Sequence, residues 1–436
     1  MNFAHRVKAV LYDKIHEMAQ YPWLFSTNPN SDFSRKRKID FQTLIQILIN
    51  MEAGSVKKEL LEFFHYDLET PTTSAFNQQR SKLLPEAMQF LFEEFSKEFD
   101  DFSTYQGYRL IACDGSDLSI ARNPEDKQTY FQTSPTSKGY NLLYLNAFYD
   151  LCSKRYLDAV IEPRQEYNEY RACISMMKRS SIDAPRILIA DRGYENYNLI
   201  AHASAEGWNY LIRIKDRNSS GIASGLQLPT EDTFDVDISL LMTRRYTNEI
   251  KAHPEIYKFL PKKAIFDFLE HGEKGTYPIR FRVVRFRLTD GTYEMLITNL
   301  DRENFPVEKL KELYGRRWGI ETSFRELKYA VGLTSFHSKK VVYIQQEIYT
   351  RLLLYNFCEI ITMHVVVEQK DTKHCYQINY TIAIHICRYF LKCLPDIRPP
   401  DVEALIRKNL LPVRDGRHDP RKVRNRSAVS FLYRVA

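Results

Sequence analysis

Several features that mark whole classes of protein are scarce or missing in this sequence. Glycine and proline number only 15 and 18 among 436 residues, which excludes a collagen-like chain or one made largely of linkers. No stretch approaches the roughly 18 uncharged apolar residues of a membrane-spanning helix, so we predict no membrane partner. The first residues interleave charge and lack the apolar centre of a secretory signal. These absences predict a cytoplasmic globular protein.

Cysteine is present but not in a pattern that binds metal or forms a disulfide framework. The seven cysteines are scattered, odd in number and without a C-x-x-C pair, which is typical of reduced thiols. Hydrophobic residues make up 44% of the chain, enough for the cores of two or three domains. The formal net charge of +7 is a modest basic excess that fits a polyanionic partner.

The two ends of the chain are predicted to be helical. Within residues 1–105, apolar residues recur at three-to-four spacing in two segments. Between these segments, 71–80 offers Thr and Ser caps before a polar helix, which predicts a helix-turn-helix and a DNA-binding region. Residues 337–436 are expected to be mainly helical and to end in a basic tail that favours DNA contact.

Between these ends, the pattern predicts an α/β fold. Strand-like runs at 108–114, 142–149 and 156–161 are followed by a regular alternation of helix and strand. The alternating elements are a helix at 168–180, a strand at 186–190, a helix at 195–206 and a strand at 210–214. This order is typical of an RNase H-like catalytic core, which we predict over 106–215 and 301–336.

The segment that interrupts this core, 216–300, is predicted to be a β-rich insertion. Alternating residues at 279–288, an Asp-Gly turn and a second run at 293–298 indicate a hairpin. One long helix is expected over 306–331, with proline at its start.

Two aspartates each follow directly after a predicted strand. Asp114 precedes Gly-Ser and Asp191 precedes Arg-Gly. Because ligands and catalytic groups gather at the carboxyl ends of strands in α/β sheets, both are candidate catalytic residues. For either aspartate alone, ordinary turn formation is the alternative.

The helix expected over 306–331 adds a third acid. At about 100° per residue, one stripe of this helix carries four polar side chains. They are Tyr314, Arg317, Glu321 and Lys328. The tyrosine hydroxyl could reach a phosphate oxygen or the ligand shell of a metal. A local ion pair between Arg317 and Glu321 is the alternative interpretation.

Together, Asp114, Asp191 and Glu321 predict a site for divalent metal. Three converging carboxylates repel one another unless cations separate them, and Mg²⁺ prefers such oxygen ligands. Cleavage of a phosphodiester uses two such ions about 4 Å apart to stabilise the attacking and leaving oxygens. Arg317 and Lys328 would then bind the phosphates of the substrate.

The same residues resemble the signature of a known family. The spacing Y-x2-R-x3-E-x6-K from Tyr314 to Lys328, with Asp114 in C-D-G-S and Asp191 in A-D-R-G-Y, is similar to that of DDE transposases of bacterial insertion sequences, the insertion-sequence-four family. The resemblance covers roughly residues 105–335. It implies cut-and-paste transposition, with cleavage of the element's ends through a hairpin intermediate and joining to target DNA. It also implies two Mg²⁺ ions, with Mn²⁺ as a possible substitute.

Partners and one further residue follow from this resemblance. It implies double-stranded DNA partners, namely terminal inverted repeats and target DNA, and a homodimer in a synaptic complex. It also implies a bacterial protein that is nucleoid-associated when bound to DNA. Family members stack a flipped base on an aromatic residue of the insertion; here Tyr293 is the nearest candidate for that substrate contact. Trp318 is interpreted as a packing residue.

Other functions could use the same fold. An RNase H-like structure-specific DNA nuclease would hydrolyse DNA without joining strands, and a domesticated DNA-binding protein would retain no chemistry. The intact acids argue against the second, and the Tyr–Arg–Lys row and the insertion argue against the first. A glycosidase with paired carboxylates would leave Arg317 and Lys328 without a role. We therefore predict a transposase.

Overall fold

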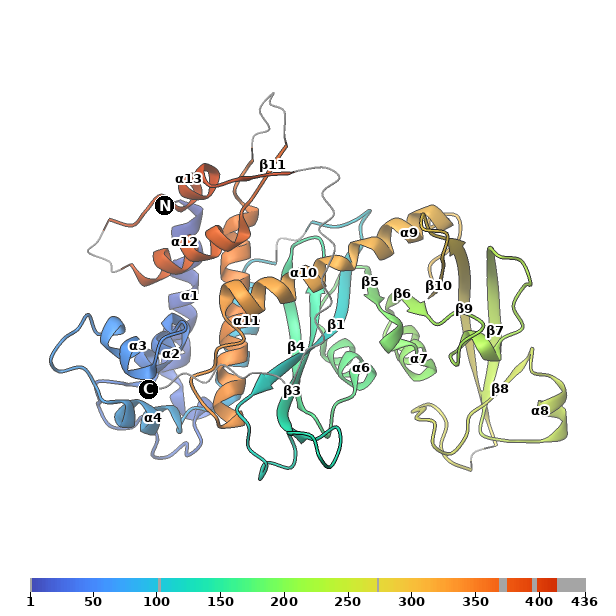
Figure 1. The fold of residues 1–436 in the computed structure, drawn as a ribbon, viewed down its shortest axis with the longest axis horizontal. Helices are drawn as coiled ribbons and strands as arrows, with labels where there is room; N and C mark the ends of the chain where they lie inside the picture. Colours follow the sequence, from blue (N-terminus) through green and yellow to red (C-terminus); the bar gives the residue numbers. More distant parts are fainter. Residues whose placement is uncertain (1, 101–102, 273, 368–374, 394–397, 414–436) are drawn as a thin grey trace.

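The computed structural model describes the chain except residues 1, 101–102, 273, 368–374, 394–397 and 414–436. The basic tail predicted at the end of the chain lies outside the described residues. The molecule is elongated, with a group of helices at one end and a sheet that crosses the remainder (Figure 1). Among the described residues, none of the helices combines the length and the apolar character that crossing a membrane requires.

Among the described residues, ten strands form one mixed sheet, which makes the fold α/β as predicted. Nine of them follow one path of hydrogen-bonded neighbours: β2 (Tyr130–Phe131), β3 (Tyr140–Asp150), β1 (Arg109–Ile120), β5 (Arg186–Ala190), β6 (Asn209–Ile214), β10 (Tyr293–Thr298), β9 (Thr276–Arg287), β7 (Phe234–Thr243) and β8 (Tyr257–Phe259). The tenth, β4 (Arg155–Pro163), pairs with β3 on the side away from β1. The strands expected at 186–190 and 210–214 and the hairpin of β3 and β4 are confirmed.

The pairing of β1 creates the opening in which the candidate site lies. β1 is antiparallel to β3 along 111–120, but it is parallel to β5 only along 109–113. Since β5 ends at Ala190 and β1 continues to Ile120, no strand of the described part of the chain pairs with the second half of β1 on its β5 side. The carboxyl end of β5 therefore faces the middle of β1.

The strands of 216–300 extend this sheet. β10 pairs antiparallel with β6, β9 pairs with β10, and β7 and β8 continue outward (Figure 1). Alternation along each strand explains the burial of both faces. In β10, for example, Met295 and Ile297 join one core, whereas Leu296 joins the other.

Helices cover the two faces of the sheet. On one face, α6 (Glu169–Arg179) and α7 (Tyr197–Ala205) pack with Ile111, Cys113 and Leu188. On the other, α9 (Val307–Arg316) packs with Leu110, and α10 (Trp318–Glu326) shares a core with Ala112. Successive residues of β1 thus point alternately toward α6 and toward the α9–α10 side.

The helical body, as we call the group at the other end, consists of α1 (Phe3–Gln20), α2 (Phe41–Asn50), α3 (Val56–Phe63), α4 (Thr73–Arg80), α5 (Pro85–Lys97), α11 (Val341–Met363), α12 (Tyr380–Lys392) and α13 (Val402–Lys408). Six of these helices begin with a side chain that accepts a hydrogen bond from an amide of the first turn, at Asn2, Asp40, Ser55, Thr72, Asn379 and Asp401. Residues 346–362 of α11 are all buried, which makes α11 the central element between body and sheet.

The single helix expected over 306–331 is wrong in detail. The segment forms α9, a turn at Arg317, α10 and a π-helical stretch at Leu327–Val331. At the turn, the amides of Arg317 and Ile320 donate to carbonyls three residues back. Tertiary packing explains the interruption: a Cβ on Gly319 would lie 2.9 Å from Cδ2 of Leu151, so α10 approaches the sheet more closely than a larger residue would permit.

Candidate active site

Asp114 and Asp191 occupy neighbouring positions in the sheet. The ladder between β1 and β5 ends with Cys113 opposite Ala190, and the next residue on each chain is the aspartate. Because adjacent strands lie about 4.8 Å apart, the two residues stand side by side at the carboxyl end of β5. Asp191 also begins the turn that follows, where its Oδ1 accepts a hydrogen bond of 2.8 Å from the amide of Gly193.

Helix α10 carries Glu321, and Arg317 at the start of this helix links Glu321 to Asp114. Nη2 of Arg317 donates to Oε1 of Glu321 at 2.6 Å, and Nη1 lies 3.5 Å from Oδ2 of Asp114. Arg317 is only 7% exposed, so it has little contact with water. The local ion pair that the sequence left open is therefore present, and its guanidinium also links the first and third acids.

Burial is the largest cause that raises the pKa of Asp114, to about 7. The amide of Gly115, which donates to Oδ1 at 2.8 Å, and the charge of Arg317 both act to lower this pKa. The negative charges of Asp191 and Glu321 raise it further. The three carboxylates are therefore close enough to influence one another, and the single positive charge of Arg317 compensates their negative charges only in part.

Tyr314 and Lys328, the other two residues of the polar stripe predicted from the sequence, flank the three carboxylates. Tyr314 is 7% exposed, and its hydroxyl has no hydrogen-bond partner among the described residues. Burial raises the pKa of Tyr314. Nζ of Lys328 donates to the backbone carbonyl of Asp117 at 3.0 Å, three residues beyond Asp114 on β1. The row thus extends along the open edge of β1.

Tyr293 is not brought together with these residues. It lies on β10 in phase with Met295, whose side chain packs on the α6–α7 face. Arg317 and Glu321 belong to α10 and its first turn, and α10 packs on the opposite face. The guanidinium of Arg285 covers the ring of Tyr293 at 4.0 Å from its centroid. Trp318, by contrast, is not the packing residue that we expected: it is 56% exposed on α10, beside Arg317.

The sequence analysis missed Glu169, which begins α6. Its carboxylate approaches Gly115, which follows Asp114 within β1, and Gly193, which lies in the turn after Asp191. Burial raises the pKa of Glu169; the hydrogen bond from Tyr167 opposes this shift, and the charge of Asp191 adds to it. The only signal in the sequence was the pair of glycines, which we had interpreted as turn residues.

A family assignment agrees with this geometry. Residues 105–357, more than half of the chain, match the family model described as the transposase DDE domain. The chain belongs to this family of transposases. Among solved structures, the transposase is similar to a chain in the cryo-EM structure of the piggyBac transposase synaptic complex with hairpin DNA, with a TM-score of 0.49 and 8% identity, covering 94% of this chain and 82% of that one. No curated protein matches the chain.

DDE transposases generally use divalent metals, and the donor set of this transposase fits one. Asp114, Asp191 and Glu321 offer only carboxylate oxygens, the ligands that hard cations prefer. Burial raises the pKa of Asp114 most and the charges of Asp191 and Glu321 add to it, whereas a bound cation would favour the ionised carboxylate. Among the described residues, no three Asp, Glu, His or Cys side chains already stand close enough to hold an ion. In this arrangement Arg317 supplies the positive charge.

Proposed function

We propose that this protein is a cut-and-paste DNA transposase of the insertion-sequence-four family. It would cleave the ends of its element, pass through a hairpin intermediate and join the ends to target DNA. The observation that carries this proposal is the adjacent placement of Asp114 and Asp191, together with an arginine bridge from Asp114 to Glu321.

The strand arrangement supports an RNase H-like core. Three antiparallel strands, β4, β3 and β1, are followed by β5 and β6, which run parallel to β1. Residues 106–215 and 301–336 would form this core, with the β-rich insertion 216–300 between β6 and α9. Acids on β1, after β5 and on α10 then converge on one end of the sheet.

Each member of the site has a role in phosphoryl transfer. Asp114, Asp191 and Glu321 would hold divalent cations, two Mg²⁺ or Mn²⁺ ions, which stabilise charge on the attacking and leaving oxygens when bound. Arg317 and Lys328 would bind phosphate oxygens and so fix the scissile bond. Tyr314 would donate its unpartnered hydroxyl to the same group. Tyr293 is retained only as a distant substrate contact, because its ring faces the other side of the sheet.

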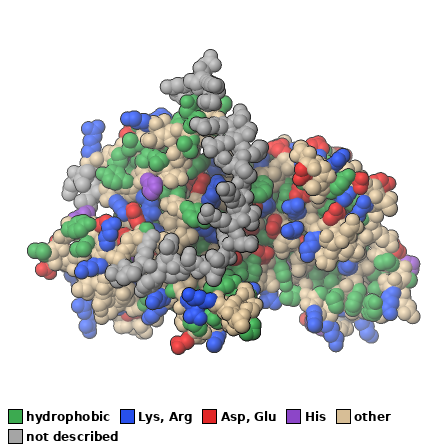
Figure 2. Space-filling model, in the orientation of Figure 1, with side chains coloured by type: hydrophobic (Ala, Val, Ile, Leu, Met, Phe, Trp, Pro, Cys, Tyr) green, Lys and Arg blue, Asp and Glu red, His purple; other side chains and the backbone are tan. Residues whose placement is uncertain are grey.

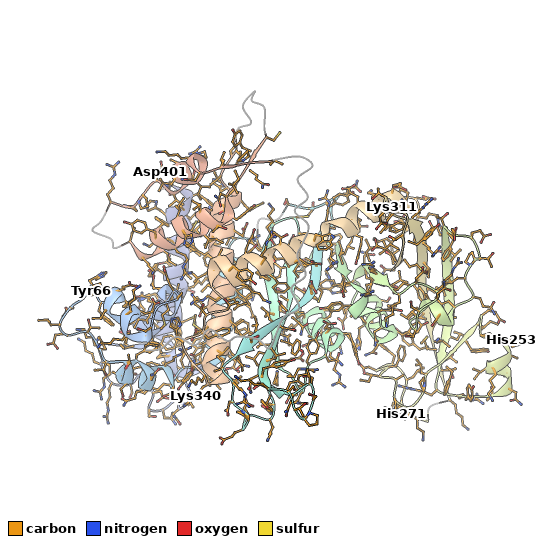
Figure 3. All side chains as sticks on the ribbon, in the orientation of Figure 1. Tyr66, His253, His271, Lys311, Lys340 and Asp401 are labelled. Carbon is orange, nitrogen blue, oxygen red and sulfur yellow. The ribbon has the colours of Figure 1, made fainter. Side chains whose placement is uncertain are left out.

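The helical body offers a surface for double-stranded DNA. Four uncharged polar side chains are exposed along α4: Ser74, Asn77, Gln78 and Ser81. They line a groove of about 850 Å³ together with Lys57, Lys339 and Lys340. Lys340 lies at the lower end of α11 in Figure 3, and Figure 2 shows Lys and Arg side chains along this lower edge.

This chemistry suits the major groove. Amide side chains such as those of Asn77 and Gln78 can bond the edge of adenine, and lysines can bind the flanking phosphates. We therefore propose that residues 1–105 bind the terminal inverted repeats through α4. Two copies would assemble on two DNA ends as a homodimeric synaptic complex.

The test is cleavage of a labelled duplex that carries the element's terminal repeat, with Mg²⁺ and with EDTA. We expect Mg²⁺-dependent nicking, then a hairpin and then a joined product. Glu321→Gln should reduce cleavage by at least about a thousandfold while end binding stays within about twofold, because a neutral amide is a poor ligand for Mg²⁺.

The matched control is Glu312→Gln, an exposed glutamate on α9 that pairs with Arg316 and accepts a hydrogen bond of 3.5 Å from the hydroxyl of Tyr105. It should cleave as the unsubstituted protein does. Nicking without any joined product would favour the structure-specific nuclease, and binding without cleavage would favour a DNA-binding protein that has lost its chemistry. If Glu321→Gln lost binding and cleavage equally, Glu321 would be structural.

A further inference from the structure

A fourth carboxylate, that of Glu169, lies between Gly115 of β1, which follows Asp114, and Gly193 in the turn after Asp191. A Cβ placed on Gly193 would lie 2.5 Å from Oε2 of Glu169, and one placed on Gly115 would lie 3.4 Å from Oε1. Neither glycine has a positive φ. The backbone conformation therefore does not require glycine at either position. What the missing side chains provide is space for the carboxylate of Glu169.

This carboxylate is held in place. The hydroxyl of Tyr167 donates a hydrogen bond to Oε1 of Glu169. The ring of Tyr167 is stacked on that of Tyr144, with centroids 3.7 Å apart and planes 21° apart. Tyr144 lies on β3 opposite Asp117 of β1, so the sheet fixes the tyrosine pair and the tyrosine pair fixes Glu169. An acid at a helix start is ordinarily free to face solvent, whereas this one is directed at the site.

Asn146 provides an independent indication that the space beside Glu169 is built for a ligand. Asn146 is fully buried on β3, in register with Gly115. Neither polar atom of its side chain has a hydrogen-bond partner among the described residues. Its Oδ1 would lie 2.9 Å from the same Cβ position on Gly115 that Glu169 approaches. A buried amide without partners is costly, so this oxygen points to a polar group or ion bound there.

We propose that Glu169 is a positioning residue of the catalytic site, whose charge strengthens the binding of the divalent cation at Asp191. The inference rests on the proposed function. Oδ1 of Asp191 would lie 3.0 Å from the same Cβ position on Gly193 that Oε2 of Glu169 approaches, so the two carboxylates are neighbours. They repel each other until a cation lies beside them, and each therefore favours its binding. Outer carboxylates of this kind commonly orient metal ligands.

The experiment compares the Glu169→Gln variant with the unsubstituted protein, both full-length, by calorimetric titration with Mn²⁺ in the absence of DNA. Glutamine keeps the size of the side chain and an oxygen for the Tyr167 hydrogen bond but removes the charge. We expect the Kd for Mn²⁺ to rise about tenfold. The Mn²⁺ concentration that gives half-maximal nicking should rise by the same factor, with the rate at saturating Mn²⁺ largely recovered.

Two further variants make the result decisive. Glu166→Gln removes an exposed charge three residues earlier and should leave the Kd unchanged. Glu169→Asp retains the charge and should restore part of the affinity. Loss of thermal stability in EDTA with an unchanged Kd for Mn²⁺ would overturn the proposal and make Glu169 structural. If the unsubstituted protein neither bound Mn²⁺ nor nicked the duplex, the proposed function itself would fail; if it did both and Glu169→Gln behaved identically, only the role of Glu169 would fail.

Discussion

The ionised carboxylate of Asp114, which the proposed metal site requires, lowers the stability of the folded protein when no metal is bound. Its carboxylate is held in a buried position beside two other acids, with one arginine as partner. The pKa of about 7 means that the folded protein retains a proton here that the unfolded chain, with an aspartate pKa of about 4, gives up. Without metal, the stability that this bound proton contributes is therefore fully present below about pH 4. It is lost as the pH rises from about 4 to about 7.

Asp114→Asn should remove this loss, because the amide cannot ionise. In EDTA, the melting temperature of the variant should exceed that of the unsubstituted protein at pH 8, and the difference should shrink at pH 5. Thermal melts at both pH values measure this. Asp117→Asn on the same strand is the control, since Asp117 is exposed and should show no such dependence. A difference of equal size at both pH values would mean that the charge of Asp114 is not its cause.

At the scale of elements, α4 shows how a short helix can be presented as a rigid surface. The side chain of Thr72 accepts a hydrogen bond of 3.2 Å from Ala75 and begins the helix. Phe76 and Arg80 are buried on its inner side, so the exposed polar side chains of α4 are held facing outward. This division of faces follows from helical periodicity, although the sequence analysis predicted only the cap and the polar character of the helix. The groove it borders includes residues of 336–343, which no local pattern could place beside α4.

Replacing both amides, as Asn77→Ala with Gln78→Ala, should weaken binding to the terminal repeat by about 2–6 kcal/mol, because each bidentate contact to a base contributes about 1–3 kcal/mol. Binding to a scrambled duplex of equal length should change little. Competition between the two duplexes measures the ratio. Asn248→Ala, an exposed amide on α8 (Asn248–Ala252) at the far end of the molecule, is the control. An equal loss for both duplexes would show that α4 contributes no sequence recognition.

At the scale of the whole molecule, buried charges connect α3 and α4 to α11, the helix next to the sheet. Nη2 of Arg80 lies 2.8 Å from Oε1 of Glu347, and both side chains are almost completely buried. Burial alone would raise the pKa of Glu347, but Arg80 and then His337 hold it at about 2. His337 in turn reaches Glu59 of α3. The network therefore fixes α3 and α4 to the helix that supports the sheet.

Arg80→Met should destabilise the protein by about 3–5 kcal/mol, since it leaves a buried carboxylate without its strongest cationic partner. Urea denaturation measures the change in the free energy of unfolding. Lys57→Met, which removes an exposed charge from α3, should change it by less than about 0.5 kcal/mol. A loss below about 1 kcal/mol for Arg80→Met would indicate that water or another cation compensates Glu347.

The sequence by itself determined the order of helices and strands around the site. Strand runs before the two aspartates predicted β5 and the first half of β1, and apolar periodicity predicted α6 and α7, because these signals arise from neighbouring residues. The expected end of the first strand at Asp114 is wrong, since β1 continues to Ile120 in its ladder with β3. The family signature likewise depends only on spacing. Local pattern failed at Arg317, where close packing of Gly319 against Leu151 interrupts the expected helix.

Only the tertiary structure decided which of the candidate residues meet. Strand pairing sets Asp114 beside Asp191, and the fold of α10 over β1 places Arg317 between Asp114 and Glu321. It also separates Tyr293 onto the other face and brings Glu169 against two glycines that are distant in sequence. Register, face and packing distance depend on contacts between residues far apart in the chain, and a single sequence carries no local record of such contacts.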